Sequence, residues 1–93
     1  MTREQAEELL ELWGQESLFA DGFDDAIIGV FESPIGSPSS AVRVVYSIEK
    51  SLAILMSRDG MDMEEADEFL TFNVIGAYVG EWTPLYIQTG VYT

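Results

Sequence analysis

One long segment of this chain changes from acidic to apolar along its length. Residues 62–80, DMEEADEFLTFNVIGAYVG, contain no turn signal until Gly80. Helical spacing forms two apolar stripes, one of Ala66, Phe69, Leu70, Asn73 and Ala77 and one of Phe72, Ile75, Gly76 and Val79. A domain of 93 residues buries only roughly 60–65% of its unfolded surface. The pattern therefore predicts a helix whose first turns are solvated and whose last turns enter the core or a contact between subunits.

The end of this segment holds small residues and one amide. Small side chains let another backbone approach closely, so the candidate oligomer contact consists of Val74, Gly76, Ala77 and Gly80. Asn73 lies within an apolar stripe, where an unpaired buried amide would cost about 1–3 kcal/mol. Asn73 therefore either ties a neighbouring strand or loop to the helix, or it orients a ligand or sets the register of a symmetric contact.

Local start and stop signals divide the rest of the chain. Thr2 and Gln5 have the spacing of a capping box, and Asp62 and Glu65 repeat it. Gly60 is a candidate left-handed residue at the end of the helix before it. Short β-branched and apolar runs predict strands. The predicted helices span residues 2–12, 47–57 and 62–80, and the predicted strands span residues 26–33, 41–48 and 83–89.

These elements predict one acidic α+β domain over residues 1–93. We expect a small antiparallel sheet of about three strands with three helices packed on it, in the order α-β-β-α-α-β. The first two strands form an antiparallel hairpin with a long loop, because two prolines and a glycine interrupt residues 33–40. The N-terminal amphipathic helix, within residues 1–14, is a candidate peripheral element.

The charge balance is strongly negative. Seventeen acidic residues face four basic ones, which gives a net charge of −13. Such a surface repels nucleic acid and anionic lipid and attracts basic protein surfaces, although carboxylates also serve solubility alone. Apolar runs are far shorter than the about 20 residues of a membrane span. We therefore expect no direct nucleic acid binding, no membrane contact and a cytosolic location.

Catalytic and metal-binding patterns are absent from the sequence. The chain has no cysteine and no histidine, which removes thiolate chemistry and the usual base near neutral pH. The carboxylates within residues 21–25 and 59–65 do not match the spacing of a calcium loop. We therefore predict no catalytic residues, no metal and no cofactor. A candidate polar site remains, formed by Tyr46, Lys50, Asn73 and Glu81.

Two stretches of the chain carry a family resemblance. FDDAIIGV (residues 23–30) and residues 44–84, with the steps Tyr46 to Lys50 and Glu64-Glu65-Ala66, are similar to a family of small uncharacterised proteins of tailed bacteriophages and prophages. The most specific part is FNVIGAYVGEWTP, residues 72–84, which matches an FNxxGAYxGExTP signature. The resemblance covers over half of the chain and implies a phage origin, but it implies no activity.

The functional prediction combines the charge with this resemblance. We expect a non-enzymatic phage accessory protein that binds a basic host protein surface, as an inhibitor or a nucleic-acid mimic. Trp82 is either an exposed contact anchor or a residue that closes the core. The alternatives are an oligomeric phage structural or assembly protein and a small-ligand, nucleotide-type binder. The predicted partner-binding residues are Glu4, Glu7, Glu8, Glu11, Asp59, Asp62, Glu64, Glu65, Glu68 and Trp82.

Overall fold

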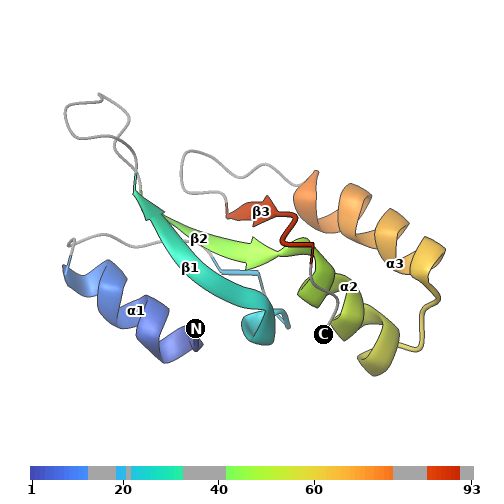
Figure 1. Cartoon of the computed structure of the whole chain (residues 1–93), viewed down its shortest axis with the longest axis horizontal. Coiled ribbons are helices and arrows are strands. Elements are labelled where there is room, and N and C mark those ends of the chain that lie inside the picture. Colours follow the sequence, from blue (N-terminus) through green and yellow to red (C-terminus); the bar gives the residue numbers. More distant parts are fainter. Residues whose placement is uncertain (13–18, 21, 33–41, 77–83, 91–93) are drawn as a thin grey trace.

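The structure, a computed structural model, describes residues 1–12, 19–20, 22–32, 42–76 and 84–90 (Figure 1). It confirms an α+β fold and the predicted order of helices and strands. Two short helical segments that the sequence did not separate, η1 and η2, adjoin β1 and α3. The elements are α1 (Arg3–Leu12), η1 (Asp24–Ala26), β1 (Ile27–Glu32), β2 (Val42–Ser47), α2 (Ile48–Arg58), α3 (Met63–Phe69), η2 (Leu70–Ile75) and β3 (Leu85–Ile87).

The three described strands form a mixed sheet in the order β1-β2-β3. β1 and β2 pair antiparallel, as predicted, whereas β2 and β3 run parallel, with Tyr46 opposite Tyr86. The prediction of an antiparallel sheet is therefore wrong for β3. The reason is the connection, because the chain passes through α2 and α3 before it returns, and a helical crossover brings the next strand back in the same direction.

The core lies on one face of this sheet. Side chains alternate between the faces of a strand, so Val44 and Tyr46 share a face, and both are fully buried. α1 contributes Ala6 and Leu10 to the same core, which places the N-terminal helix within the packed domain. The remaining buried apolar residues of the core are Phe23, Ala26, Ile27, Leu52, Leu55, Ala66 and Leu70.

The predicted helix caps are present as hydrogen bonds. The Gln5 N–H donates to Thr2 Oγ1 at 3.1 Å, and the Thr2 N–H donates to Gln5 Oε1 at 2.9 Å. Asp62 and Glu65 form the second reciprocal box, in which the Glu65 N–H donates to Asp62 Oδ1 at 2.8 Å. Gly60 has a φ of 68°, which confirms the left-handed turn after α2.

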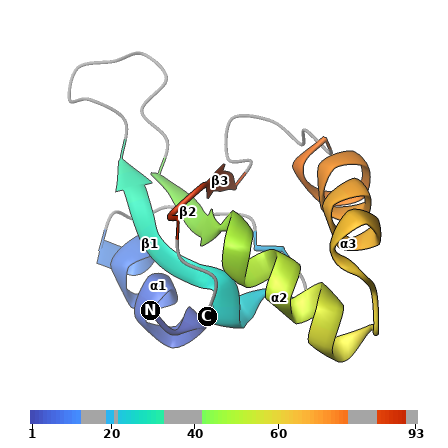
Figure 2. The same cartoon turned by 45° about the vertical axis from the view of Figure 1, so that its right-hand side comes forward.

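The molecule is elongated, with extents of 42 × 23 × 22 Å. α1 and α3 lie at opposite ends of the long axis, with the sheet and α2 between them (Figure 1). α2 packs against β2 on one side and against α3 on the other (Figure 2). α3 is therefore the outermost layer at its end of the molecule. Within the described residues, no helix is long and apolar enough to cross a membrane.

Candidate protein-binding surface

α3 continues without a break into η2, which is a π-helix. A π-helix closes hydrogen bonds between residues five apart, and the Gly76 N–H donates to the Thr71 carbonyl oxygen at 2.9 Å. The wider turn keeps residues four apart on one side, so Ala66, Leu70 and Val74 form the row that packs inward. Ala66 and Leu70 are fully buried and Val74 is half-buried.

The π-helix corrects the prediction for Asn73. Helical spacing placed Asn73 in a buried apolar stripe, but its side chain is exposed. Because the turn widens after Leu70, the inward position passes from residue 73 to residue 74. Asn73 therefore needs no buried partner, and the cost of an unpaired amide does not arise.

The same change exposes the apolar side chains that were expected to be buried at the end of the segment. Phe72 is 74% exposed, and Phe69 and Ile75 are also exposed. The expectation that these last turns enter the core is therefore wrong for the exposed side chains and holds for Leu70 and Val74, whereas the alternative of a contact between subunits stays a prediction. A large exposed aromatic side chain with two exposed apolar neighbours is typical of an interaction site.

Carboxylates precede these apolar side chains by one helical turn. Residues four apart lie on the same side of a helix, so Glu64, Glu68 and Phe72 form one row, and Glu65 lies one turn before Phe69. Glu64, Glu65 and Glu68 are all exposed, and Glu65 also caps α3. We call this combined region the Phe72 surface; it consists of Glu64, Glu65, Glu68, Phe69, Phe72 and Ile75.

The other predicted acidic contact residues are exposed but do not join this surface. Asp59 accepts two hydrogen bonds from Arg58, at 3.0 and 3.1 Å, and these hold the pKa of Asp59 below its usual value. Asp62 is used as the cap of α3. The acids of α1 lie at the opposite end of the molecule (Figure 1), where Glu7 pairs with Arg3; they are Glu4, Glu7, Glu8 and Glu11.

The predicted polar site does not form one accessible group. Tyr46 is fully buried, its hydroxyl accepts a hydrogen bond from the Ala20 N–H at 2.8 Å, and its ring stacks on Tyr86 at 5.3 Å. Lys50 is half-buried in the first turn of α2, while Asn73 is exposed on η2. Glu81 lies outside the described residues.

Burial of Tyr86 accompanies this stacking. β3 places its ring on the core side of the sheet, opposite Tyr46. Removal from water disfavours the charged phenolate, so burial raises the pKa of Tyr86 to about 12. Tyr86 therefore acts as a neutral packing group, and its stack on Tyr46 joins β3 to the sheet.

The predicted oligomer contact lies partly outside the described residues. Ala77, Gly80 and the predicted anchor Trp82 all belong to that part of the chain. Val74 packs on the core of its own domain. At Gly76, an added Cβ would lie 3.0 Å from the Thr71 carbonyl oxygen, so the helix itself accounts for the glycine.

Sequence reasoning missed one buried carboxylate. Glu49, which is 3% exposed, accepts hydrogen bonds from the Thr89 N–H at 2.8 Å, the Thr89 hydroxyl at 3.1 Å and the Gly90 N–H at 2.8 Å. These bonds favour the charged form, and the bond from the Thr89 N–H contributes most, so the pKa of Glu49 falls to about 2. Glu49 fixes the segment after β3, forty residues away, and no local pattern signals such a bond.

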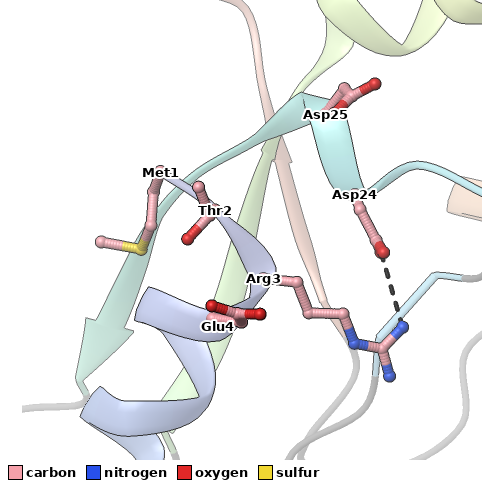
Figure 3. Close-up of a pocket in the computed structure, with 6 residues that line it drawn as sticks. All are labelled: Met1, Thr2, Arg3, Glu4, Asp24 and Asp25. Atoms are coloured by element: carbon pink, nitrogen blue, oxygen red, sulfur yellow. Dashed lines mark ion pairs between the residues drawn. The ribbon is translucent and has the colours of Figure 1, made fainter.

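A shallow hollow of about 510 Å³ lies between the start of α1 and η1 (Figure 3). Its two cationic groups already have partners within the chain, because Arg3 reaches Asp24 Oδ1 at 3.5 Å and the Met1 ammonium donates to the Ile27 carbonyl oxygen at 3.2 Å. Asp25 points away from Arg3 in Figure 3. Because groups of the chain already occupy both cations, we assign no ligand site to this hollow. No cluster of three acidic residues within the described ranges is placed to hold a metal ion.

Comparison with known proteins gives no family assignment. No protein-family model matches the chain. No curated protein and no solved structure matches it either. The function must therefore be argued from the chain's own surfaces.

Proposed function

We propose that this chain is a non-enzymatic phage accessory protein that binds a basic host protein in the host cytoplasm through the Phe72 surface. The phage origin rests on the sequence resemblance, and the class of partner rests on charge and exposed apolar area. The observation that carries the proposal is a phenylalanine 74% exposed, one turn after a row of exposed carboxylates.

Phe72 has the character of a contact anchor. Aromatic side chains supply a large share of binding energy when they enter a pocket of a partner, and the surrounding contacts exclude water. Phe69 at the end of α3 and Ile75 at the end of η2 flank Phe72 and can form such a surrounding contact. The fold does not need this ring in its own core, because Ala66, Leu70 and Val74 already hold the helix against the domain.

The carboxylates define the chemistry of the partner. With a net charge of −13, the chain attracts a positive surface over long distances and speeds its association, an effect that salt weakens. Glu64 and Glu68 would contact Lys or Arg side chains beside the pocket that receives Phe72. The fitting partner is therefore a basic surface with an apolar pocket at its centre. Occupation of such a surface can inhibit the partner, by exclusion of nucleic acid where that is its ligand.

Within the chain itself, arginine side chains already stack on phenylalanine rings in cation–π contacts. Arg3 lies over the Phe19 ring at 4.4 Å, and Arg58 lies 5.5 Å from the centre of the Phe23 ring. A partner's arginine could stack on Phe72 in the same way, while its neighbours pair with the carboxylates. This contact would join the aromatic and acidic parts of the Phe72 surface in one interaction.

The test is co-purification from host lysate with matched variants. We expect a basic protein to be recovered with the wild-type chain at low salt and to be lost at high salt. Phe72→Ala should weaken binding about tenfold or more, and Glu64→Gln/Glu68→Gln should chiefly slow association. The control is Glu8→Gln/Glu11→Gln, which makes the same charge change on α1 at the other end of the molecule. Recovery of no basic partner, or equal losses with both double variants, would refute the proposal.

A further inference from the structure

The face of the sheet opposite the core is only partly covered. Phe31 on β1 and Ile87 on β3 are 48% and 45% exposed, and the β2 residue between them, Val45, is half-buried. Register places these side chains on one face, because Phe31 pairs with Arg43, and Val45 pairs with both Gly29 and Leu85. We call this the open sheet face; its residues are Gly29, Phe31, Arg43, Val45, Leu85 and Ile87.

On β1 an exposed ring, Phe31, lies beside an open position, Gly29; we call Phe31 the knob and the space above Gly29 the hollow. Gly29 and Phe31 are two residues apart and therefore point to the same face. Within the part of the chain that the structure describes, and apart from Gly29 and its two chain neighbours, no atom lies within 4 Å of the place where a Cβ on Gly29 would be, so this position is open above the strand. The φ of Gly29 is not positive, which means that backbone conformation alone does not require glycine here. A large exposed ring thus stands next to an empty position of the same strand.

This arrangement is complementary to itself. A twofold axis that crosses β1 between Gly29 and Phe31 would place the Phe31 ring of one copy over Gly29 of the other, and the reverse. In an isologous contact the same patch of both copies meets, so that patch must be complementary to itself. Two sheets packed face to face lie about 10 Å apart, a spacing that a phenylalanine ring can bridge.

Charge also favours a second copy over a different partner at this face. Two chains that each carry −13 repel one another wherever their carboxylates meet. The open sheet face, as described, has no acidic residue, and its one charged residue is Arg43. A basic partner would be drawn to the acidic Phe72 surface at the α3 end instead. On the open sheet face, two copies can therefore approach without bringing the carboxylates of that face together.

We propose that the open sheet face is the contact between two copies of this chain, with Phe31 of each copy seated over Gly29 of the other. This contact is separate from the Phe72 surface at the α3 end, so a dimer presents two Phe72 surfaces. Such a dimer would bind a repeated or symmetric basic partner with increased avidity.

The dependence on salt distinguishes the proposed dimer from the proposed binding of a basic partner. Added salt screens the repulsion between like-charged copies and should strengthen the dimer, whereas it should weaken the attraction to a basic partner. Between roughly 0.01 M and roughly 1 M salt, the Debye length falls from about 30 Å to about 3 Å. The two associations are therefore expected to respond in opposite directions over this range.

Sedimentation equilibrium of the full chain tests the proposal, with two variants that act differently. We expect a monomer–dimer equilibrium whose dimer fraction rises with salt. Phe31→Glu places a carboxylate in the contact and should abolish the dimer. Gly29→Val fills the hollow and should also abolish it, while circular dichroism shows an intact fold, because valine suits a strand and has room in the monomer.

The matched control is Phe72→Glu, which makes the same substitution on the other surface. This variant should keep the dimer and lose the basic partner, whereas Phe31→Glu should lose the dimer and still capture the partner. A monomer at every salt concentration would overturn the dimer proposal. A dimer that persists in both Phe31→Glu and Gly29→Val would overturn it too. Neither result depends on whether a basic partner exists.

Discussion

Glu49 shows how a single acid can stabilise a fold in a chain that is already rich in acids. Its carboxylate accepts three hydrogen bonds from Thr89 and Gly90, which lie just beyond β3. Glu49→Gln keeps the size of the side chain but turns one acceptor oxygen into a donor NH₂ group, which would face a backbone N–H. We expect this variant to lower Tm by several degrees, with thermal unfolding at neutral pH as the measurement. Glu8→Gln, on an exposed position of α1, should leave Tm unchanged.

The same residue gives the chain a specific acid dependence. The pKa of Glu49 is about 2 in the folded protein against 4.5 for the free side chain. A lowered pKa adds stability that is complete above about pH 4.5 and is lost as the pH falls toward about 2. The difference in free energy of unfolding between wild type and Glu49→Gln should shrink over this window, as measured by urea unfolding. A constant difference from pH 5 to pH 2 would contradict the role of the ionised carboxylate.

The raised pKa of Tyr86 predicts that the fold loses stability at alkaline pH. Burial raises its pKa from 10.0 to about 12, so its contribution to stability is complete below about pH 10 and is lost as the pH rises toward about 12. Tyr86→Phe keeps the ring that stacks on Tyr46 and removes the ionisable hydroxyl. We expect this variant to resist alkaline unfolding better than the wild type. A tyrosinate absorbance titration in which every tyrosine ionises near pH 10 would contradict this prediction.

At the scale of the element, local signals succeeded where the interaction itself is local. The capping pairs Thr2–Gln5 and Asp62–Glu65 are three residues apart, and the turn at Gly60 follows from one residue type, so all were predictable from the sequence. The parallel pairing of β3 was not predictable in this way, because it depends on where a helical crossover returns the chain. The hydrogen bonds of Glu49 to residues about forty positions away were likewise not predictable from the local sequence.

The π-helix is the element-scale failure with the largest consequence for the candidate site. Residue types alone do not signal the change from four- to five-residue hydrogen bonds, yet that change moves the inward position from Asn73 to Val74 and leaves Phe72 exposed. The chemistry of the site, acidic and aromatic, was visible in the sequence. Its placement on the outside of the domain was not.

The exchanged roles of Asn73 and Val74 can be tested directly. Val74 packs against the core, so Val74→Ala should destabilise the fold by about 1 kcal/mol. Asn73→Ala should change the free energy of unfolding by less than about 0.5 kcal/mol, because its side chain is exposed. Chemical unfolding of the two variants gives both values. A larger loss for Asn73→Ala than for Val74→Ala would mean that an ordinary α-helix persists through this segment.

For the whole molecule, self-repulsion is the dominant electrostatic effect. A net charge of −13 on a body of 42 × 23 × 22 Å destabilises the compact state, because unfolding separates the charges. The three described ion pairs involve only Arg3 and Arg58 and leave most carboxylates uncompensated. Salt should therefore raise Tm even in a strictly monomeric variant such as Phe31→Glu.

Concentration then distinguishes this charge effect from self-association. A dimer that forms only from folded chains adds stability by mass action, so the Tm of the wild type should rise with protein concentration. The Tm of Phe31→Glu should be independent of concentration, while both proteins gain stability from salt. The comparison is differential scanning calorimetry at several concentrations in low and in high salt. If the wild type shows no concentration dependence even in high salt, where repulsion between copies is weakest, then the exposed Phe31 and Ile87 have no counterpart in a second copy and the open sheet face must serve another role.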